Sequence, residues 1–329
     1  ELEKKNRKWK TTQKPHTLTG MKELFFKLNQ DTLLHLWHRM INMYGVDSSN
    51  ISGELHTKKI KVVAEMVSLF LSISQKEVKV IKGTTPPPFV HSPEANKLLT
   101  LFMEWLIEGC SRKDTSFSEG QYIAYVSLCK ILCQKCSQPL EKKLLAHSYR
   151  VLHYGLNTTS GATPKSIEAI FLNSRHFFSL GYAGSNILIP DFIDAASSIL
   201  KESANKELRI AAIHVLISII CTCYFYDNAD LPDLTQVLRT KQLPSRGGEE
   251  ATQNHTFVKL RAKICQLLML AVVDDRFPEA QIKCLWGMYL IIHKELTSDE
   301  DKGSSVKFII DAILSFIVHK DDTVAQASL

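Results

Sequence analysis

The sequence predicts an all-α fold, because three observations agree. Apolar residues recur every three or four positions from residue 31 onward, which is the spacing that places side chains on one face of a helix. The 329 residues include 14 Gly and 11 Pro, fewer than a turn-rich β sandwich requires. Hydrophobic residues make up 45% of the chain and charged residues 22%, so a large core can be buried.

The first predicted helix follows Asp31, a good N-cap residue, and ends at Gly45, whose conformational freedom suits a helix end. The same apolar spacing continues over residues 60–71. Residues 78–81 alternate between apolar and basic side chains, a pattern that fits either a short strand or the end of that helix. No other stretch indicates a strand.

A proline-rich stretch at 84–88 predicts an extended linker. The next helix opens at Ser92-Pro93-Glu94, where a cap, a proline and an acid coincide, and it runs to Gly109. Further helices are predicted over residues 119–135, 138–155, 163–180 with a break near Ser174, 188–202, 205–225, 231–240, 255–273, 278–295 and 304–319.

Helix pairs that repeat at roughly 40-residue spacing are typical of an α-solenoid, an armadillo-like or HEAT-like helical array. Each pair would leave one apolar face for its neighbour to cover, which explains why the predicted helices are so apolar. No pair aligns convincingly on another, so a less regular multi-helix array is the alternative.

The net charge of +6 is unevenly distributed, since residues 1–14 hold six Lys or Arg and two Glu. We therefore expect a basic, disordered lead-in over 1–17 and a helical array over 18–329, subdivided near 83–92 and 241–254. The nearly neutral remainder predicts no nucleic-acid partner. Contact of the lead-in with RNA or an anionic membrane is the alternative.

Residues 210–226 carry no formal charge and lie between Arg209 and Asp227. This stretch is shorter than the ~20 apolar residues of a membrane-spanning helix. We interpret it as the buried centre of a helical stack and expect no integral membrane segment. The charged start of the chain indicates no signal peptide, so we expect a cytoplasmic chain; its first residue, Glu, suggests part of a longer protein.

Four of the eight cysteines lie within apolar helical patterns, as reduced core cysteines do. The pair near residue 222 is separated by one residue and so does not form the redox motif CxxC. We expect all four to pack in the core: Cys221, Cys223, Cys265 and Cys284.

The sharpest candidate for chemistry is Cys129-x3-Cys133-x2-Cys136, the spacing of the iron–sulfur triplet in radical enzymes that use S-adenosylmethionine. The surrounding pattern is helical, however, and predicts all three thiols on one helix face with no barrel strands after them. Core packing is therefore favoured over a cluster. A zinc site completed by His147 or His153 would fit no finger class.

Other possible motifs are incomplete. His35 and His38 lie three residues apart without an HExxH pattern, which predicts surface or boundary histidines. Residues 181–185 lack the third element of a GxGxxG loop, and neither a Walker A loop nor GxSxG occurs. The acidic clusters at 274–275 and 299–301 are expected to be solvated loops. We therefore expect no catalytic, cofactor-binding or metal-ligating residue, no cofactor and no enzyme activity.

Residues 177–196, FFSLGYAGSNILIPDFIDAA, resemble a signature stretch in the helical region of Ral GTPase-activating protein subunits, relatives of tuberin. The resemblance covers residues 18–326, and its order and spacing are more similar to alpha subunits than to beta subunits. Other segments that agree in order are Leu18–Gly20, Leu36–Met40, Pro86–Pro88, Glu104–Leu106 and Thr323–Gln326, the last of which is expected to open one more helix.

The resemblance implies a helical body that pairs an alpha with a beta subunit. In that family a separate C-terminal domain, related to Rap-type activators, inserts an asparagine that drives GTP hydrolysis on Ral. No such α/β domain is recognisable in this sequence, so no catalytic residue is carried over. The linkers near 47–53 and 241–254 match nothing in the family pattern.

The favoured hypothesis is thus a non-catalytic helical scaffold segment that supports complex assembly. The resemblance implies the beta subunit as partner, and a Ral-type small GTPase through the full-length protein. The alternative is a HEAT-type adaptor for protein interactions unrelated to small GTPases. A radical or metal enzyme built on the cysteine triplet is the weakest hypothesis.

Overall fold

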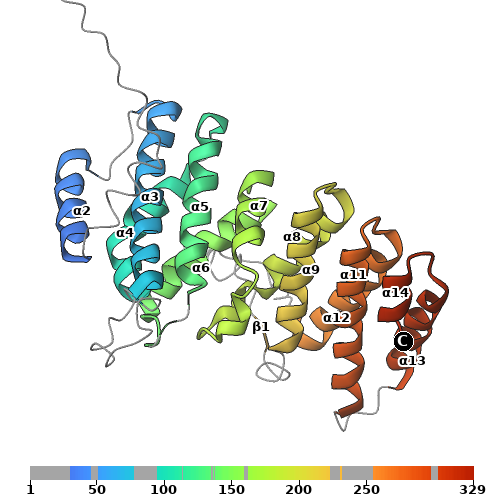
Figure 1. Cartoon of the computed structure of the whole chain (residues 1–329). Coiled ribbons are helices and arrows are strands. Elements are labelled where there is room, and N and C mark those ends of the chain that lie inside the picture. Colours follow the sequence, from blue (N-terminus) through green and yellow to red (C-terminus); the bar gives the residue numbers. More distant parts are fainter. Residues whose placement is uncertain are drawn as a thin grey trace, which may run out of the picture. The chain divides into compact units, whose positions relative to one another are not determined.

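The computed structural model describes residues 30–45, 51–77, 95–112, 114–134, 136, 138–158, 162–222, 230–231, 255–297 and 303–329 (Figure 1). Several predictions lie outside the described residues: the lead-in at 1–17, the stretch at 78–81, the linkers at 83–92 and 241–254, the burial of Cys223, and the acidic cluster at 299–301. These remain predictions.

The chain divides into two compact units, one made of Glu1–Asp47 with Glu65–Pro93 and the other of Ser48–Ala64 with Glu94–Leu329. Helix α2 (Gln30–Tyr44) belongs to the first unit, whereas α3 (Gly53–Glu77) contributes its second half to the first unit and its first half to the second. In the first unit, the apolar spacing expected from the sequence buries Leu33 and Trp37 on α2.

The second unit is an array of helices with few other elements. Its α-helices are α4 (Ala95–Ser111), α5 (Ser118–Leu132), α6 (Lys142–Leu156), α7 (Pro164–Asn173), α8 (Ile189–Glu202), α9 (Lys206–Cys221), α11 (Phe257–Asp274), α12 (Pro278–Thr297), α13 (Gly303–Leu314) and α14 (Asp322–Ala327). Short 3-10 helices are η1 (Thr115–Phe117), η3 (Phe178–Leu180), η4 (Ser185–Leu188) and η6 (Ser315–Val318). The prediction of an all-α helical array is confirmed.

Two strands of two residues each accompany the helices. Strand β1 (Asp230–Leu231) pairs antiparallel with β2 (His255–Thr256). Leu231 was expected to begin a helix over 231–240 and His255 to begin the helix that in fact starts at Phe257, so both boundaries were wrong. Residues 232–240 lie outside the described part of the chain.

Local capping explains where helix α7 starts. At α7, the Thr163 hydroxyl accepts the Ser166 N–H at 3.1 Å while the Ser166 hydroxyl accepts the Thr163 N–H at 3.0 Å, and Pro164 follows the cap. The helix ends at Asn173, which confirms the break expected near Ser174. The helix expected to open at Thr323–Gln326 is also present, as α14.

The second unit is built in two layers. Each helix pair places its first helix in one layer and its second helix in the other. The pairs are α4/α5, α6/α7, α8/α9 and α11/α12. The first members contact one another in the order α4, α6, α8, α11, and the second members in the order α5, α7, α9, α12 (Figure 1). Because each pair packs on its sequence neighbours, this is the arrangement of an α-solenoid.

Helix α9 is apolar around most of its circumference because it has neighbours in both layers. It packs against α7, α8, α11 and α12, and Ala212, Ile213 and Leu216 are fully buried. The interpretation of 210–226 as the centre of a stack is therefore confirmed for the helical part, although α9 ends at Cys221 and not at 225. Within the described residues, no helix is both long and apolar enough to cross a bilayer.

Candidate functional site

The cysteine triplet does not share one helix face. Cys129 is buried in α5, Cys133 is the residue just after the last turn of that helix, and Cys136 lies beyond it. The predicted helix over 119–135 ends at Leu132, where the Tyr182 hydroxyl donates a hydrogen bond to the Leu132 carbonyl at 2.6 Å. The prediction of a common face was wrong because α5 ends at Leu132, before Cys133 and Cys136.

Burial makes the thiols of Cys129 and Cys133 poor nucleophiles and poor metal ligands. Desolvation raises the pKa of Cys129 well above 9.0 and that of Cys133 to about 12. A thiol reacts and binds metal as its thiolate, which is scarce at such values. The Cys136 sulfur instead lies 3.9 Å from the Tyr182 hydroxyl. Their surroundings are those of packed side chains, as expected for Cys129.

The other residues singled out from the sequence are scattered. His35, His38 and His147 are exposed, and Cys221 is exposed at the end of α9 instead of buried as expected. Cys284 is buried and Cys265 is half-buried. Among the residues that the structure describes, no three His, Cys, Asp or Glu side chains are grouped so as to hold a metal ion.

A recurring contact joins the two helices of a pair. In four pairs of the described array, a side chain near the start of the second helix donates to a carbonyl oxygen near the end of the first. The donors and acceptors are Gln121 Nε2 to Cys110 O at 3.1 Å, Ser166 Oγ to Gly155 O at 2.9 Å, Arg209 Nη1 to Leu200 O at 2.7 Å, and Gln281 Nε2 to Val272 O at 3.1 Å.

These contacts have a common physical reason. The last carbonyl groups of a helix lack partners within that helix, and where two helices meet they are also hidden from water. A donor from the next helix satisfies them and fixes the angle of the turn. The donors are Gln, Ser, Arg and Gln, so the repeat is one of geometry and not of residue type.

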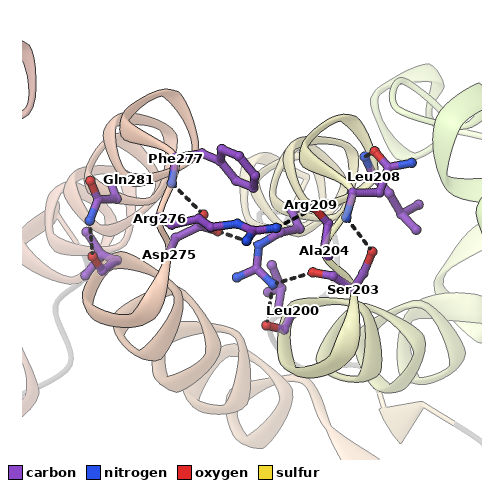
Figure 2. A network of polar contacts seen from close by, with 11 residues as sticks. Leu200, Ser203, Ala204, Leu208, Arg209, Asp275, Arg276, Phe277 and Gln281 are labelled. Atoms are coloured by element: carbon purple, nitrogen blue, oxygen red, sulfur yellow. Dashed lines mark hydrogen bonds and ion pairs between the residues drawn. The ribbon is translucent and has the colours of Figure 1, made fainter.

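Arg209 extends this contact into a network between two helix pairs (Figure 2). Its Nε donates to Asp275 Oδ2 at 2.7 Å, and its Nη1 also reaches the carbonyl of Ser203 at 3.1 Å. The other oxygen of Asp275 accepts the N–H of Phe277 at 3.0 Å, and Arg276 donates to the carbonyl of Ala204 at 3.1 Å. The turn before α9 and the turn before α12 are thereby tied together.

The burial of this ion pair was not foreseen. The side chain of Asp275 is 0% exposed and that of Arg209 is 9% exposed, whereas the sequence suggested a solvated acidic loop at 274–275. Asp274 does remain exposed. The signal available was Arg209, a single charged residue at the edge of an apolar run. Its partner Asp275 lies 66 residues away and could not be inferred from spacing.

A cavity of about 500 Å³ lies beside this network. It is lined by the turn Leu200–Ala204, by Arg209 and Arg276, and by one side of α11 that includes Leu267 and Leu270. Among its described lining residues, Ser203 supplies a hydroxyl, but neither a His nor a Cys is present to act as its base or as a nucleophile. The carboxylates of Glu202 and Asp274 also line the cavity, which can receive a side chain or small molecule.

Two buried histidines hold helices together instead of facing a cavity. His153 Nδ1 lies 2.8 Å from Asp191 Oδ2 and links α6 to α8, with the histidine only 1% exposed. His56 Nε2 lies 3.2 Å from Glu108 Oε2. Burial lowers the pKa of His56, and the nearby Glu108 carboxylate only partly opposes this. A His–Asp pair can serve catalysis, but here the ring cannot reach a substrate.

The stretch that carries the resemblance, 177–196, is a packed turn followed by α8. Phe178 and Phe192 rings meet edge to face with centroids 5.1 Å apart, and the Tyr149 hydroxyl donates to the Ala183 carbonyl at 2.9 Å. Gly181 and Gly184 adopt φ of 65° and 74°, which favour glycine. These residues form a compact connection, not a phosphate-binding loop.

Comparisons with known proteins agree on one group of relatives. The chain is 27% identical over 216 residues to Ral GTPase-activating protein subunit alpha-2 of Rattus norvegicus, covering 63% of this chain. It is 26% identical over 313 residues, 95% of this chain, to subunit alpha-1 of Homo sapiens. The match to subunit beta of Homo sapiens is weaker, at 22% identity over 54% of this chain.

These matches cover only a small part of each relative. The chain spans 11% of the rat alpha-2 subunit, 14% of human alpha-1 and 12% of human beta. No protein-family model matches the sequence, and no solved structure gives a significant match. The similarity therefore connects this helical array with one segment of much longer GTPase-activating protein subunits.

Proposed function

We propose that this chain is a non-catalytic helical scaffold segment of a Ral GTPase-activating protein subunit of the alpha type, acting in the cytoplasm. The observation that carries the proposal is the match to human subunit alpha-1 over 95% of the chain, against 54% for subunit beta. The longer alignment with this alpha subunit favours the alpha type for the segment.

The structure supports the scaffold part of this proposal. In a solenoid each helix pair contacts its neighbours, so the array presents long surfaces on which partners can assemble. The buried ionisable groups Arg209, Asp275, His153 and Asp191 are engaged in contacts between helices. Such contacts stiffen the array and leave these groups unable to act on a bound nucleotide.

Two assays test the proposal. GTP hydrolysis by purified Ral is measured with and without the 329-residue chain, and we expect the rate to be unchanged. Affinity capture with purified human Ral GTPase-activating protein subunit beta is expected to retain the chain. Clear acceleration of hydrolysis would refute the non-catalytic role, whereas normal folding without capture of the beta subunit would favour an adaptor unrelated to small GTPases.

A further inference from the structure

Helix α12 exposes a regular stripe of large side chains. Trp286, Tyr289 and Leu296 are 58%, 61% and 69% exposed, and His293 is exposed between the last two. The spacing of three or four residues places all four on one face. The opposite face, which includes Met288, is buried against the array. Isolated exposed apolar residues are ordinary, but two adjacent aromatics on one stripe are typical of an interface.

Helix α9 lies alongside α12 and runs in the same direction. Lys206 pairs with Glu279 at 3.0 Å, and further along a Cβ on Gly287 would come within 3.0 Å of the Ile217 side chain. The absence of a side chain at Gly287 thus allows α9 and α12 to approach closely. In this register His214, one turn before Ile217, comes near Lys283, one turn before Gly287.

The charges around His214 are mostly positive. The pKa of this half-buried histidine is lowered by burial first, and then by the charges of Lys283, Arg175 and His176. Lys283 comes from α12, and Arg175 and His176 come from the turn after α7. Among the described residues, the acid that opposes these charges at His214 is Glu279, which is already paired with Lys206.

Arg175 adds a permanent positive charge that acts on His214. The side chain is half-buried and its Nε atom is buried, so a partner protein can reach Arg175 only through the exposed part of the side chain. A carboxylate is the group best matched to a guanidinium. The face therefore has basic groups at one edge and exposed aromatics at the other. This combination favours a partner that is both acidic and apolar.

We propose that the face formed by Arg175, His176, His214, Lys283, Trp286 and Tyr289 is a docking site for an acidic amphipathic helix of a partner protein. Its carboxylates contact Lys283 of α12 and Arg175 of the turn after α7, and its apolar side chains cover Trp286 and Tyr289. The site is independent of which GTPase-activating subunit the chain resembles, since it follows from charge and exposure alone.

The test measures binding of fluorescein-labelled 18-residue peptides to the 329-residue chain by fluorescence anisotropy. The probe peptide has Leu and Phe at helical spacing and Glu at the remaining positions. One comparison peptide replaces each Glu with Lys, and another replaces Leu and Phe with Ala. We expect the probe to bind about tenfold or more tightly than either comparison peptide, because both halves of the face contribute.

Variants locate the site. Lys283→Glu and Trp286→Ala are each expected to weaken probe binding about tenfold, and Tyr289→Ala repeats the test on the same stripe. The matched controls are Lys201→Glu and Leu270→Ala, in the other layer; Leu270 is 56% exposed, close to the value for Trp286. Both control residues line the cavity. The control variants are therefore expected to bind the probe peptide with unchanged affinity unless the peptide binds in the cavity.

The proposal would be overturned if the probe showed no saturable binding up to about 1 mM, or if the acidic and basic peptides bound equally well. It would also be overturned if the control variants weakened probe binding and the site variants did not. Tighter binding of an 18-nucleotide single-stranded RNA than of the probe would have the same meaning. Sedimentation that shows self-association dependent on Trp286, with no probe binding, would assign the face to a second copy and equally overturn it.

Discussion

Replacing Arg209 with leucine tests whether the buried ion pair fixes the junction between the α8/α9 and α11/α12 pairs. The substitution removes the guanidinium from Asp275 and leaves a shorter, apolar side chain in its place. Asp275 keeps one hydrogen bond, from the N–H of Phe277, but its other oxygen loses its partner at 2.7 Å. The carbonyls of Leu200 and Ser203 lose their donor as well.

The size of the effect follows from burial. A carboxylate whose side chain is 0% exposed cannot recover hydration when its cation is removed. Breaking a buried pair by removing one member costs about 3–5 kcal/mol, and we expect Arg209→Leu to fall in this range. The carbonyls of Leu200 and Ser203 lose a donor as well, which adds to the cost. Asp275→Leu is expected to be similarly destabilising, since it leaves the buried guanidinium with carbonyl partners but no counter-charge.

A double-mutant cycle separates the pair from its surroundings. Removing both charges leaves no unpaired ion, so Arg209→Leu with Asp275→Leu is expected to be more stable than the sum of the single changes by about 1–3 kcal/mol. Urea unfolding gives the free energy of unfolding, and hydrogen exchange of α9 and α12 amides locates the opening.

The matched control is Lys206→Ala, which breaks an ion pair between the same two helices. The Lys206 and Glu279 side chains are 44% and 53% exposed, so solvent replaces the lost contact and stability is expected to stay within experimental error. A loss below about 1 kcal/mol for Arg209→Leu, or strictly additive single changes, would refute the claim that the buried pair holds this junction.

Three further predictions follow from burial and packing. Gly155→Ala is expected to cost about 1–3 kcal/mol in urea unfolding, because the new Cβ would lie 2.6 Å from the Tyr125 ring; unchanged stability would show that the ring can move away. The pKa of buried His56 lies below its ordinary 6.5, so the unfolded chain takes up a proton first as pH falls and stability decreases below pH 6.5; thermal unfolding of His56→Gln should show a smaller decrease, and an identical pH profile would contradict this. Iodoacetamide should modify exposed Cys221 in the folded chain but buried Cys129 only after unfolding, as mass spectrometry can establish; rapid modification of Cys129 would argue against its burial.

The helical character of the chain was accessible from sequence because it depends on local spacing. Apolar residues at every third or fourth position predicted the buried faces of α4, α8 and α12, and Thr163-Pro164 marked the start of α7. Boundaries set by distant contacts were less accessible. The Leu132 carbonyl at the end of α5 accepts a hydrogen bond from the hydroxyl of Tyr182, a partner that no local pattern near residue 132 reveals.

The candidate docking face could be predicted only in part. Trp286 and Tyr289 stand out in the sequence as aromatics on a helix, but the same spacing would fit core residues. Their exposure depends on which faces of α12 are covered by α9, α11, α13 and α14. The cationic surroundings of His214 likewise combine Lys283 of α12 with Arg175 and His176 of the turn after α7, which lie far apart along the chain.

The sequence by itself determined that the chain forms successive amphipathic helices and which segments of it resemble Ral GTPase-activating protein subunits. Both depend on short-range order, namely the 3.6-residue period of a helix and the identity of neighbouring residues. The tertiary structure alone decided that the pairs stack in two layers, and that Gln121, Ser166, Arg209 and Gln281 play equivalent roles. These residues differ in type because an unsatisfied carbonyl accepts a hydrogen bond from any suitable donor; what the fold repeats is the position of the donor, which exists only once the helices have packed.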